Sequence, residues 1–279
     1  MIHLVTDTTA YLPKTAIDQW PIHMVPLKVN IGNAAVDEDK IAPEDFYRRL
    51  ASVETAPSTS QPAPGEFMTL YEELTRNGDE VLSVHISEGL SGTPLVAQMT
   101  AREVASDRIT VVDSQATTCI LALMVEAVAQ ALADGASRAE AAAVVEEIRE
   151  QFGSAFLVED LEYLRKGGRI NGAAKFLGTM LNVRPILYLK DGKIEPLGLA
   201  RTRKRGLRQL VKEVQKQVGD TPVRVAVTHI QRLDEAQALA EQIEGQLQCE
   251  ELFINETGPV IGSHVGPGFI GFSAYSIAN

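Results

Sequence analysis

The stretch VLSVHISEGLSGTPLVAQMTAREVA, residues 81–105, passes from a strand pattern to a helix pattern through one short polar loop. Its first part, 81–86, is apolar and β-rich, and its last part, 94–105, begins with a proline, which fits the first turn of a helix. Strands that alternate with helices in this way are typical of a parallel, doubly wound sheet. The alternation extends over the first half of the chain, with strands expected at 2–6, 25–31, 81–86 and 109–112 and helices at 44–51, 64–76, 94–105, 116–133 and 138–151.

The second half of the chain has a different pattern. Two β-rich runs flank Asp191-Gly192, which is a hairpin signal and predicts antiparallel pairing. The expected elements are strands at 185–189, 194–199 and 223–228, helices at 204–218 and 236–247, and a glycine-rich segment at 258–271. We therefore expect an α/β protein with two domains: residues 1–152, with a mostly parallel doubly wound sheet, and residues 153–279, with a mixed sheet that contains the hairpin.

The composition is that of an ordinary globular protein, with 45% hydrophobic and 23% charged residues. The net charge of −11 argues against a bulk electrostatic grip on nucleic acid or on an anionic membrane. Cys119 and Cys249 have no motif partner, so neither a zinc cluster nor a disulfide framework is expected. The first residues contain no basic region and no apolar run is long enough to span a bilayer, which indicates a soluble, cytoplasmic protein without a secretory signal.

Two loops rich in hydroxyl groups precede expected helices. Ser58-Thr59-Ser60 comes just before the helix that begins near Pro64. Hydroxyls at such a place cap the unpaired N–H groups of a helix, and the same N–H groups attract a carboxylate or phosphate; the residues alone favour capping. Ser91-Gly92-Thr93 lies at the carboxyl end of a strand, where open α/β sheets bind ligands. A capped polar loop and a ligand site fit this second loop equally well.

The loop after residues 81–86 also admits a catalytic interpretation. The run Gly89-Leu-Ser91-Gly-Thr93 differs from the nucleophile elbow G-x-S-x-G only at its last position, and His264 follows in the order that a Ser–acid–His triad requires. The missing final glycine and the absence of an HGGG-like element count against this interpretation. A serine-dependent lipid esterase that uses Ser91 and His264 is therefore the alternative function.

The remaining candidate binding residues are arginines and a histidine. Arg169 follows a glycine pair, either as a solvated charge after a helix end or as a contact for an anion. The run 201–205 is the densest in positive charge, but it has no aromatic platform and does not predict nucleic-acid binding. His264 has no metal-ligand spacing with the other histidines, so no metal site is expected. The sequence contains no P-loop and no G-x-G-x-x-G after a strand, so the usual ATP and dinucleotide loops are absent.

Seven segments, in order along nearly the whole chain, carry a resemblance to a known family. They are VTDTT (5–9), TSQP (59–62), LSGT (90–93), VDS (112–114), EDLEYLRKGGRI (159–170), Arg201-Thr202 and HVGPG (264–268). With these segments the chain resembles the DegV family of bacterial lipid-binding proteins, which includes the fatty-acid-binding (FakB) subunits of fatty acid kinase. One departure is Pro94, where the family often has an aromatic residue.

The resemblance implies a two-domain α/β protein that buries a long-chain fatty acid between its domains. The ligand-binding residues that it implies are Thr59, Ser60, Ser91, Gly92, Thr93, Arg169, Arg201 and His264. Among them, Thr59 and Ser91 would hydrogen-bond the carboxylate, His264 would lie close to it, and the two arginines would form a basic rim. The resemblance implies no catalytic residue, cofactor, metal or transmembrane segment. It is compatible with transient contact with a membrane. An ATP-dependent kinase subunit would phosphorylate the bound carboxylate, and the acyl phosphate would enter phospholipid synthesis.

Overall fold

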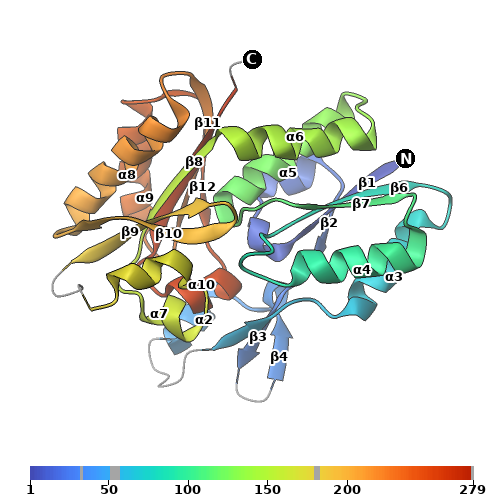
Figure 1. Ribbon diagram of the computed structural model, residues 1–279, viewed down its shortest axis with the longest axis horizontal. Helices are drawn as coiled ribbons and strands as arrows, with labels where there is room; N and C mark the ends of the chain where they lie inside the picture. Colours follow the sequence, from blue (N-terminus) through green and yellow to red (C-terminus); the bar gives the residue numbers. More distant parts are fainter. Residues whose placement is uncertain (32–33, 51–56, 179–182, 278–279) are drawn as a thin grey trace.

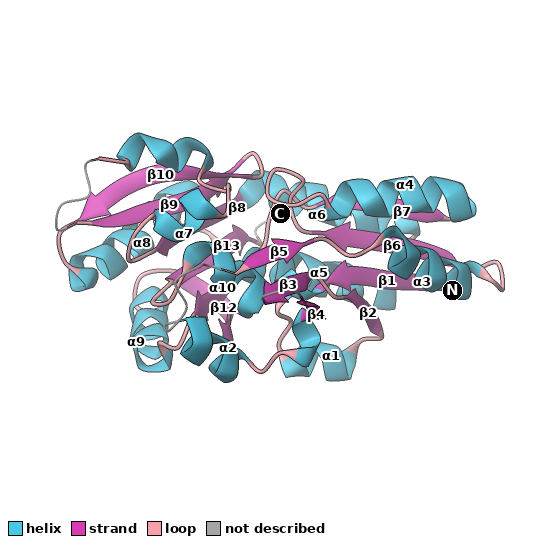
Figure 2. Ribbon diagram, turned by 90° about the horizontal axis from the view of Figure 1, so that it is seen from below, coloured by secondary structure: helices cyan, strands magenta, loops and turns pink. Residues whose placement is uncertain are grey.

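The computed structural model describes residues 1–31, 34–50, 57–178 and 183–277. Three sheets organise these residues: a parallel sheet in the order β2-β1-β6-β7, a mixed sheet in the order β10-β9-β8-β13-β11-β12, and a small sheet in the order β4-β3-β5. The two larger sheets lie in opposite halves of the molecule (Figure 1). Seen from below, the small sheet lies between those halves (Figure 2).

The first half of the chain builds the parallel sheet. Its strands are β1 (Ile2–Asp7), β2 (Ile22–Val25), β6 (Glu80–His85) and β7 (Ile109–Asp113). Helices α3 (Pro64–Thr75) and α4 (Thr93–Ala105) cover one face, and α5 (Thr118–Ala133) and α6 (Arg138–Gln151) cover the other (Figure 1). With helices on both faces, this is the doubly wound parallel sheet that the sequence predicts.

The second half builds the mixed sheet. Its strands are β8 (Phe152–Leu157), β9 (Arg184–Lys190), β10 (Lys193–Ala200), β11 (Pro222–His229), β12 (Gln248–Glu256) and β13 (Ile270–Ser276). Strands β11 and β12 are parallel, and the other neighbours pair antiparallel. Helices α8 (Arg203–Val218) and α9 (Leu233–Glu244) pack on one face. The division proposed at residues 152 and 153 falls where the chain enters this sheet.

The expected hairpin is confirmed. Strands β9 and β10 pair from Lys190 and Lys193 outward, and Asp191 and Gly192 between them both have positive φ angles. Two positive φ angles in a two-residue loop match the right-handed twist of the strands. The turn packs against the other half of the molecule, because the Ser87 hydroxyl donates to the Gly192 carbonyl over 2.7 Å. The hairpin therefore joins the mixed sheet to the loop that follows β6.

Helix α5 is the element that the two halves share. It contacts β1 of the parallel sheet and β11 and β13 of the mixed sheet. Every side chain from Thr118 to Glu126 is buried, as expected for a helix enclosed on all sides. Along β11, Val225 and Val227 join the core under α8 and α9, whereas Ala226 joins the core around α5. The mixed sheet is thus covered on both faces, and α5 begins between the sheets.

Short elements connect these layers. They are β3 (Lys28–Ile31), β4 (Ala34–Asp37) and β5 (Ser58–Ser60), with helices α1 (Lys14–Gln19), α2 (Pro43–Leu50), α7 (Glu162–Lys166) and α10 (Pro259–Val265) and 3-10 turns at 8–10, 38–40 and 171–176. Helix α10 contacts both β3 and β5. Residue 51, the last of the helix expected at 44–51, lies outside the described residues.

Some sequence expectations were wrong in detail. The single strand expected at 25–31 is two strands, because Pro26 has no N–H to donate and the chain turns there from β2 into β3. The glycine-rich segment at 258–271 was not expected to contain regular structure, yet it holds α10 and the beginning of β13. The edge strand β12 was also missed.

Candidate functional site

A cavity of about 460 Å³ lies between the two halves. Its volume falls in the range of small-molecule sites, roughly 300–1,000 Å³. It is lined by β5, the loop after β6, the beginning of α5, α7, α10 and strands β8 and β13. The apolar part of the wall consists of Leu27, Ile86, Leu90, Phe156, Leu164, Leu189, Ile194, Val260, Ile261, Val265, Phe269 and Phe272. Such a wall suits a ligand with a large apolar part.

Thr59 and His264 meet in the wall of this cavity. The Thr59 hydroxyl lies 2.7 Å from His264 Nε2, which joins β5 to α10. His264 is only 7% exposed, and its Nδ1 has no hydrogen-bond partner among the described residues. Burial, and then the charge of Arg169, lower the pKa of His264 to about 4. The imidazole is therefore neutral near pH 7 and acts as a hydrogen-bonding group without charge.

Gly167 sets the position of the imidazole. A Cβ built on Gly167 would overlap His264 Nδ1, so only glycine allows the α7 end to approach the ring this closely. The backbone of Gly167 is also bound, because Arg169 donates from Nη1 to its carbonyl over 2.6 Å. The glycine pair that the sequence suggests as a helix end is therefore also the support of His264.

Ser91 lines the cavity at the end of the loop after β6. Its hydroxyl lies 2.9 Å from Thr93 Oγ1 and accepts a weak bond of 3.3 Å from the Thr93 N–H. The N-cap of α4 is Gly92 and no side chain caps this helix, so Ser91 is a cavity-lining residue that contacts the first residue of α4 and is not its cap. Thr93 is fully buried behind Ser91 and, like Gly92, is not among the residues that line the cavity.

The two hydroxyl loops are in contact through Gln61, which sequence reasoning missed. A Cβ on Gly92 would overlap Gln61 Oε1, so the glycine leaves room for this side chain. Gln61 lines the cavity together with Thr59 and Ser60. Capping, the interpretation favoured for Ser58–Ser60, is wrong: these residues form β5, and α3 begins after Ala63 without a side-chain cap. A cavity-lining strand explains the hydroxyl run instead.

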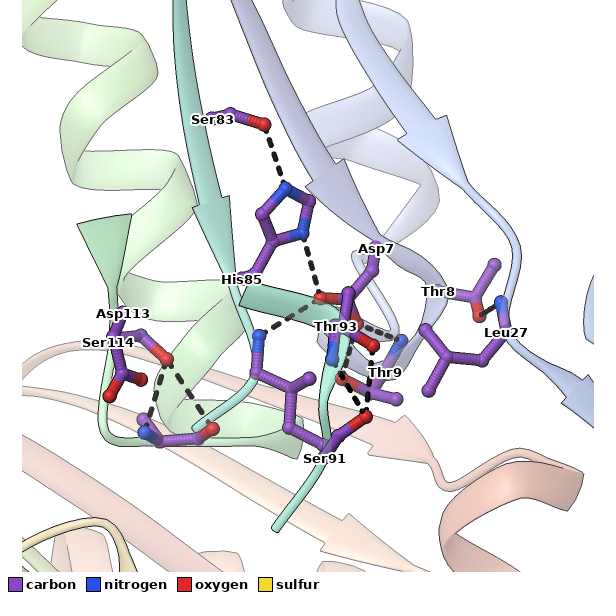
Figure 3. Close-up of polar contacts among 12 residues, drawn as sticks. Asp7, Thr8, Thr9, Leu27, Ser83, His85, Ser91, Thr93, Asp113 and Ser114 are labelled. Atoms are coloured by element: carbon purple, nitrogen blue, oxygen red, sulfur yellow. Dashed lines mark hydrogen bonds and ion pairs between the residues drawn. The ribbon is translucent and has the colours of Figure 1, made fainter. Parts of the chain in front are cut away.

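A buried polar network positions the loop that carries Ser91. Asp7, at the end of β1, accepts hydrogen bonds from the N–H and hydroxyl of Thr9, from His85 Nδ1 and from the Ile86 N–H (Figure 3). His85 Nε2 in turn lies 2.7 Å from Ser83 Oγ. Asp7 and His85 are fully buried, so the network ties the ends of β1 and β6 together in the interior. Asp7 belongs to the VTDTT motif, which carried no role on its own, and no motif singled out His85.

The two candidate arginines have different places. Arg169 lines the cavity and donates from Nε to the Leu90 carbonyl over 3.0 Å, one residue before Ser91. Arg201 is exposed and is not among the residues that line the cavity. Its neighbour Arg203 is instead held by ion pairs to Glu159 and Glu235. Only Arg169 of the two brings a positive charge to the cavity.

The parts of a serine hydrolase are not assembled. His264 Nε2 contacts Thr59 rather than Ser91, and in the described chain no carboxylate contacts Nδ1 to orient the ring. A Ser–His–acid triad needs both contacts. Among the described residues, no group of three or more His, Cys, Asp or Glu could hold a metal ion. Within the same ranges, no helix has the length and hydrophobicity needed to cross a membrane.

The arrangement suits a molecule with an apolar body and a polar end. The apolar wall suits the body, and the hydroxyls of Thr59 and Ser91 line the cavity together with His264 and Arg169. Hydroxyl, imidazole and guanidinium groups all donate hydrogen bonds. A carboxylate is the end group that such donors bind well.

The similarity to known proteins extends over nearly the whole chain. A family model described as "Uncharacterised protein, DegV family" matches residues 1–276. A DegV domain-containing protein of Halalkalibacterium halodurans is 36% identical over 278 residues, which is 98% of each chain.

Two solved structures have the same fold. One, from Thermus thermophilus, is described as showing fatty acid binding of a DegV family protein; it is 38% identical, with a TM-score of 0.94 over 99% of each chain. The other, DegV from Bacillus subtilis, is described as a fatty acid binding protein; it is 32% identical, with a TM-score of 0.89 over 99% of each chain. The chain described above belongs to the DegV family.

Proposed function

We propose that this protein binds a long-chain fatty acid in the cavity and presents its carboxylate to an ATP-dependent kinase subunit. The observation that carries the proposal is a largely apolar cavity whose wall contains hydrogen-bond donors, among them the paired side chains of Thr59 and His264. Relatives of the same fold are described as fatty-acid-binding. In this proposal the kinase supplies ATP and catalysis, and this chain supplies the bound acid.

The acyl chain provides most of the affinity. Burying some ten methylenes at about 0.8 kcal/mol each is worth roughly 8 kcal/mol before the cost of ordering the ligand. A hydrogen bond to a charged group contributes only about 1.5–3 kcal/mol. The apolar wall therefore holds the ligand, while the polar residues determine which end of it reaches the partner.

His264 and Thr59 act together on the head group. In the proposed tautomer, His264 Nε2–H donates to Thr59 Oγ1, which leaves the Thr59 hydroxyl hydrogen for the carboxylate. Nδ1 then carries no proton, which fits its place against Gly167, where no hydrogen-bond partner is described. Ser91 donates the second hydrogen bond, and Ser60 on β5 and Gly92 and Thr93 at the beginning of α4 surround it.

Arg169 supplies the positive charge beside this head group. It lines the cavity and is fixed by the carbonyls of Leu90 and Gly167. The charge favours the carboxylate and, after transfer, the more negative acyl phosphate. Arg201, which the family resemblance places on the same rim, is given no contact with the ligand because it does not line the cavity.

Native mass spectrometry of the purified protein, followed by solvent extraction, tests the proposed ligand. We expect a co-purified long-chain acid, and we expect the delipidated protein to rebind an added fatty acid. A protein that carries no lipid and does not bind fatty acid after delipidation contradicts the proposal. The esterase alternative is tested separately, because a fluorophosphonate would label Ser91 only in a serine hydrolase.

A further inference from the structure

A second group of polar side chains lines the same cavity, on elements other than those that carry Thr59, Ser91 and His264. It consists of Thr117 and Cys119 at the beginning of α5, Ser154 on β8 and Ser273 on β13. We call these four residues the second polar cluster. Ser154 and Ser273 are directly opposite each other in the antiparallel pair of β8 and β13. Their side chains therefore lie on the same face of the mixed sheet.

Both serines of this cluster use their oxygen as an acceptor. Ser154 Oγ accepts from the Leu189 N–H over 3.0 Å, and Ser273 Oγ accepts from the Cys119 thiol over 3.4 Å. Burial raises the pKa of the Cys119 thiol, so the thiol keeps its proton and stays a donor. In the part of the chain that the structure describes, neither serine hydroxyl donates its own hydrogen to an acceptor. Each therefore has one donor to spare.

Thr117 adds a hydroxyl that has no hydrogen-bond partner among the described residues. It is only 8% exposed, and it stands at the N-cap of α5 without capping the helix. The N-terminus of this 16-residue helix, with its partial positive charge, lies beside it. Among the described residues, the hydroxyl hydrogens of this cluster therefore have no acceptor partner. Buried donors without acceptors are costly, and proteins normally pair them.

We infer that the second polar cluster binds an oxygen atom carried along the acyl chain, so that this protein selects fatty acids with a hydroxyl or keto group on the chain. This inference rests on the proposed function. An unsubstituted acyl chain would place methylenes against the unpaired hydroxyl hydrogens of Ser154 and Ser273, whereas an oxygen on the chain would accept hydrogen bonds from them. In a wholly apolar tunnel the same oxygen would lose its hydrogen bonds to water and weaken binding. A keto oxygen suffices, because the cluster supplies the donors.

The experiment compares the dissociation constants of stearate and of its hydroxy and keto derivatives, substituted at position 2 or at positions along the middle of the chain. The full-length, delipidated protein is titrated with each acid against a fluorescent fatty acid. We expect at least one mid-chain derivative to bind as tightly as stearate or more tightly. We expect Ser273→Ala to weaken that derivative about tenfold more than it weakens stearate, with Ser106→Ala, an exposed serine outside the cavity, as the control.

Two results would overturn the inference while the proposed function stands. In one, stearate binds and every mid-chain derivative binds more weakly. In the other, Ser273→Ala weakens stearate and the derivative equally. If no acid binds at all, the proposed function itself fails. Thr117→Val, which keeps the shape of the side chain and removes its hydroxyl, is made alongside and carries the same expectation if Ser273→Ala does not fold.

Discussion

The Thr59 hydroxyl lies 2.7 Å from His264 Nε2, although 205 positions separate the two residues in the chain. The bond links the small sheet to α10, so it exists only when the end of the chain has packed against the first half. Because this bond forms in the wall of the cavity, the geometry of the site depends on how the two halves pack against each other.

The close approach of Gly92 and Gln61 predicts the effect of a single methyl group. Gly92→Ala places a Cβ on Gln61 Oε1, so either the side chain of Gln61 or the loop with Ser91 must move. We expect a loss of about 1–3 kcal/mol in the free energy of unfolding, together with weaker fatty acid binding. Chemical denaturation measures the first and ligand titration the second. Gly65→Ala, where a Cβ meets nothing within 4 Å, is the control and should be neutral or slightly stabilising.

The neutral state of His264 predicts a dependence of stability on pH. The pKa of His264 is about 4 in the folded protein and near 6.5 in the unfolded chain, so the unfolded state binds the proton more tightly. The stabilisation is fully present above pH 6.5 and is lost as the pH falls toward 4, by an amount on the order of 3 kcal/mol. Denaturation curves of the wild type and of His264→Gln between these pH values measure it. An equally steep loss in the variant would assign the effect to other groups.

Ser91→Ala distinguishes binding of the acyl chain from orientation of its carboxylate for the kinase. Ser91→Ala leaves the apolar wall intact, so we expect the affinity for fatty acid to fall by no more than about tenfold. The loss of one donor at the head group should reduce kinase-dependent acyl phosphate formation by a larger factor. The measurement pairs ligand titration with phosphorylation by the kinase subunit at saturating acid. Unchanged turnover in Ser91→Ala would show that this hydroxyl does not orient the carboxylate.

Two arginines that the sequence treats alike should behave differently. Arg169→Gln removes a charge from the cavity wall and frees the Leu90 carbonyl, so we expect the dissociation constant of a fatty acid to rise about tenfold. Arg201→Gln changes an exposed side chain that does not line the cavity, so its effect should stay within about twofold. Equal losses in the two variants would restore Arg201 to the site.

The sequence predicted most of the first half because its elements carry their signals locally. The proline at the start of α4 and the Ser137–Glu140 capping box of α6 are recognisable without knowing any neighbour, and so is the Asp191-Gly192 turn of the second half. Strand β13 was missed because its glycine is explained only by a partner: a Cβ on Gly271 would overlap Phe156 on the adjacent strand β8. Close approach between distant segments leaves no periodic pattern in the chain.

The same limit applies to the site. Motif resemblance pointed to Thr59, Ser91 and His264, and the structure brings all three to one cavity. The contact of Gln61 with Gly92 could not be predicted, because it depends on how two loops pack. The dense positive charge at 201–205 did not predict that Arg169, outside this run, is the arginine that lines the cavity. Whether a charged side chain faces a cavity depends on packing, which the local sequence does not show.

The position of β13 has a consequence for how the cavity is completed. This last strand lies inside the mixed sheet, between β8 and β11, and Gly271, Phe272 and Ser273 form part of the cavity wall. Without β13 the sheet has a gap between β8 and β11, and the cavity lacks part of its wall. The pairing of β13 therefore completes the sheet and closes the cavity wall in a single step, and local unfolding of this strand would open both together.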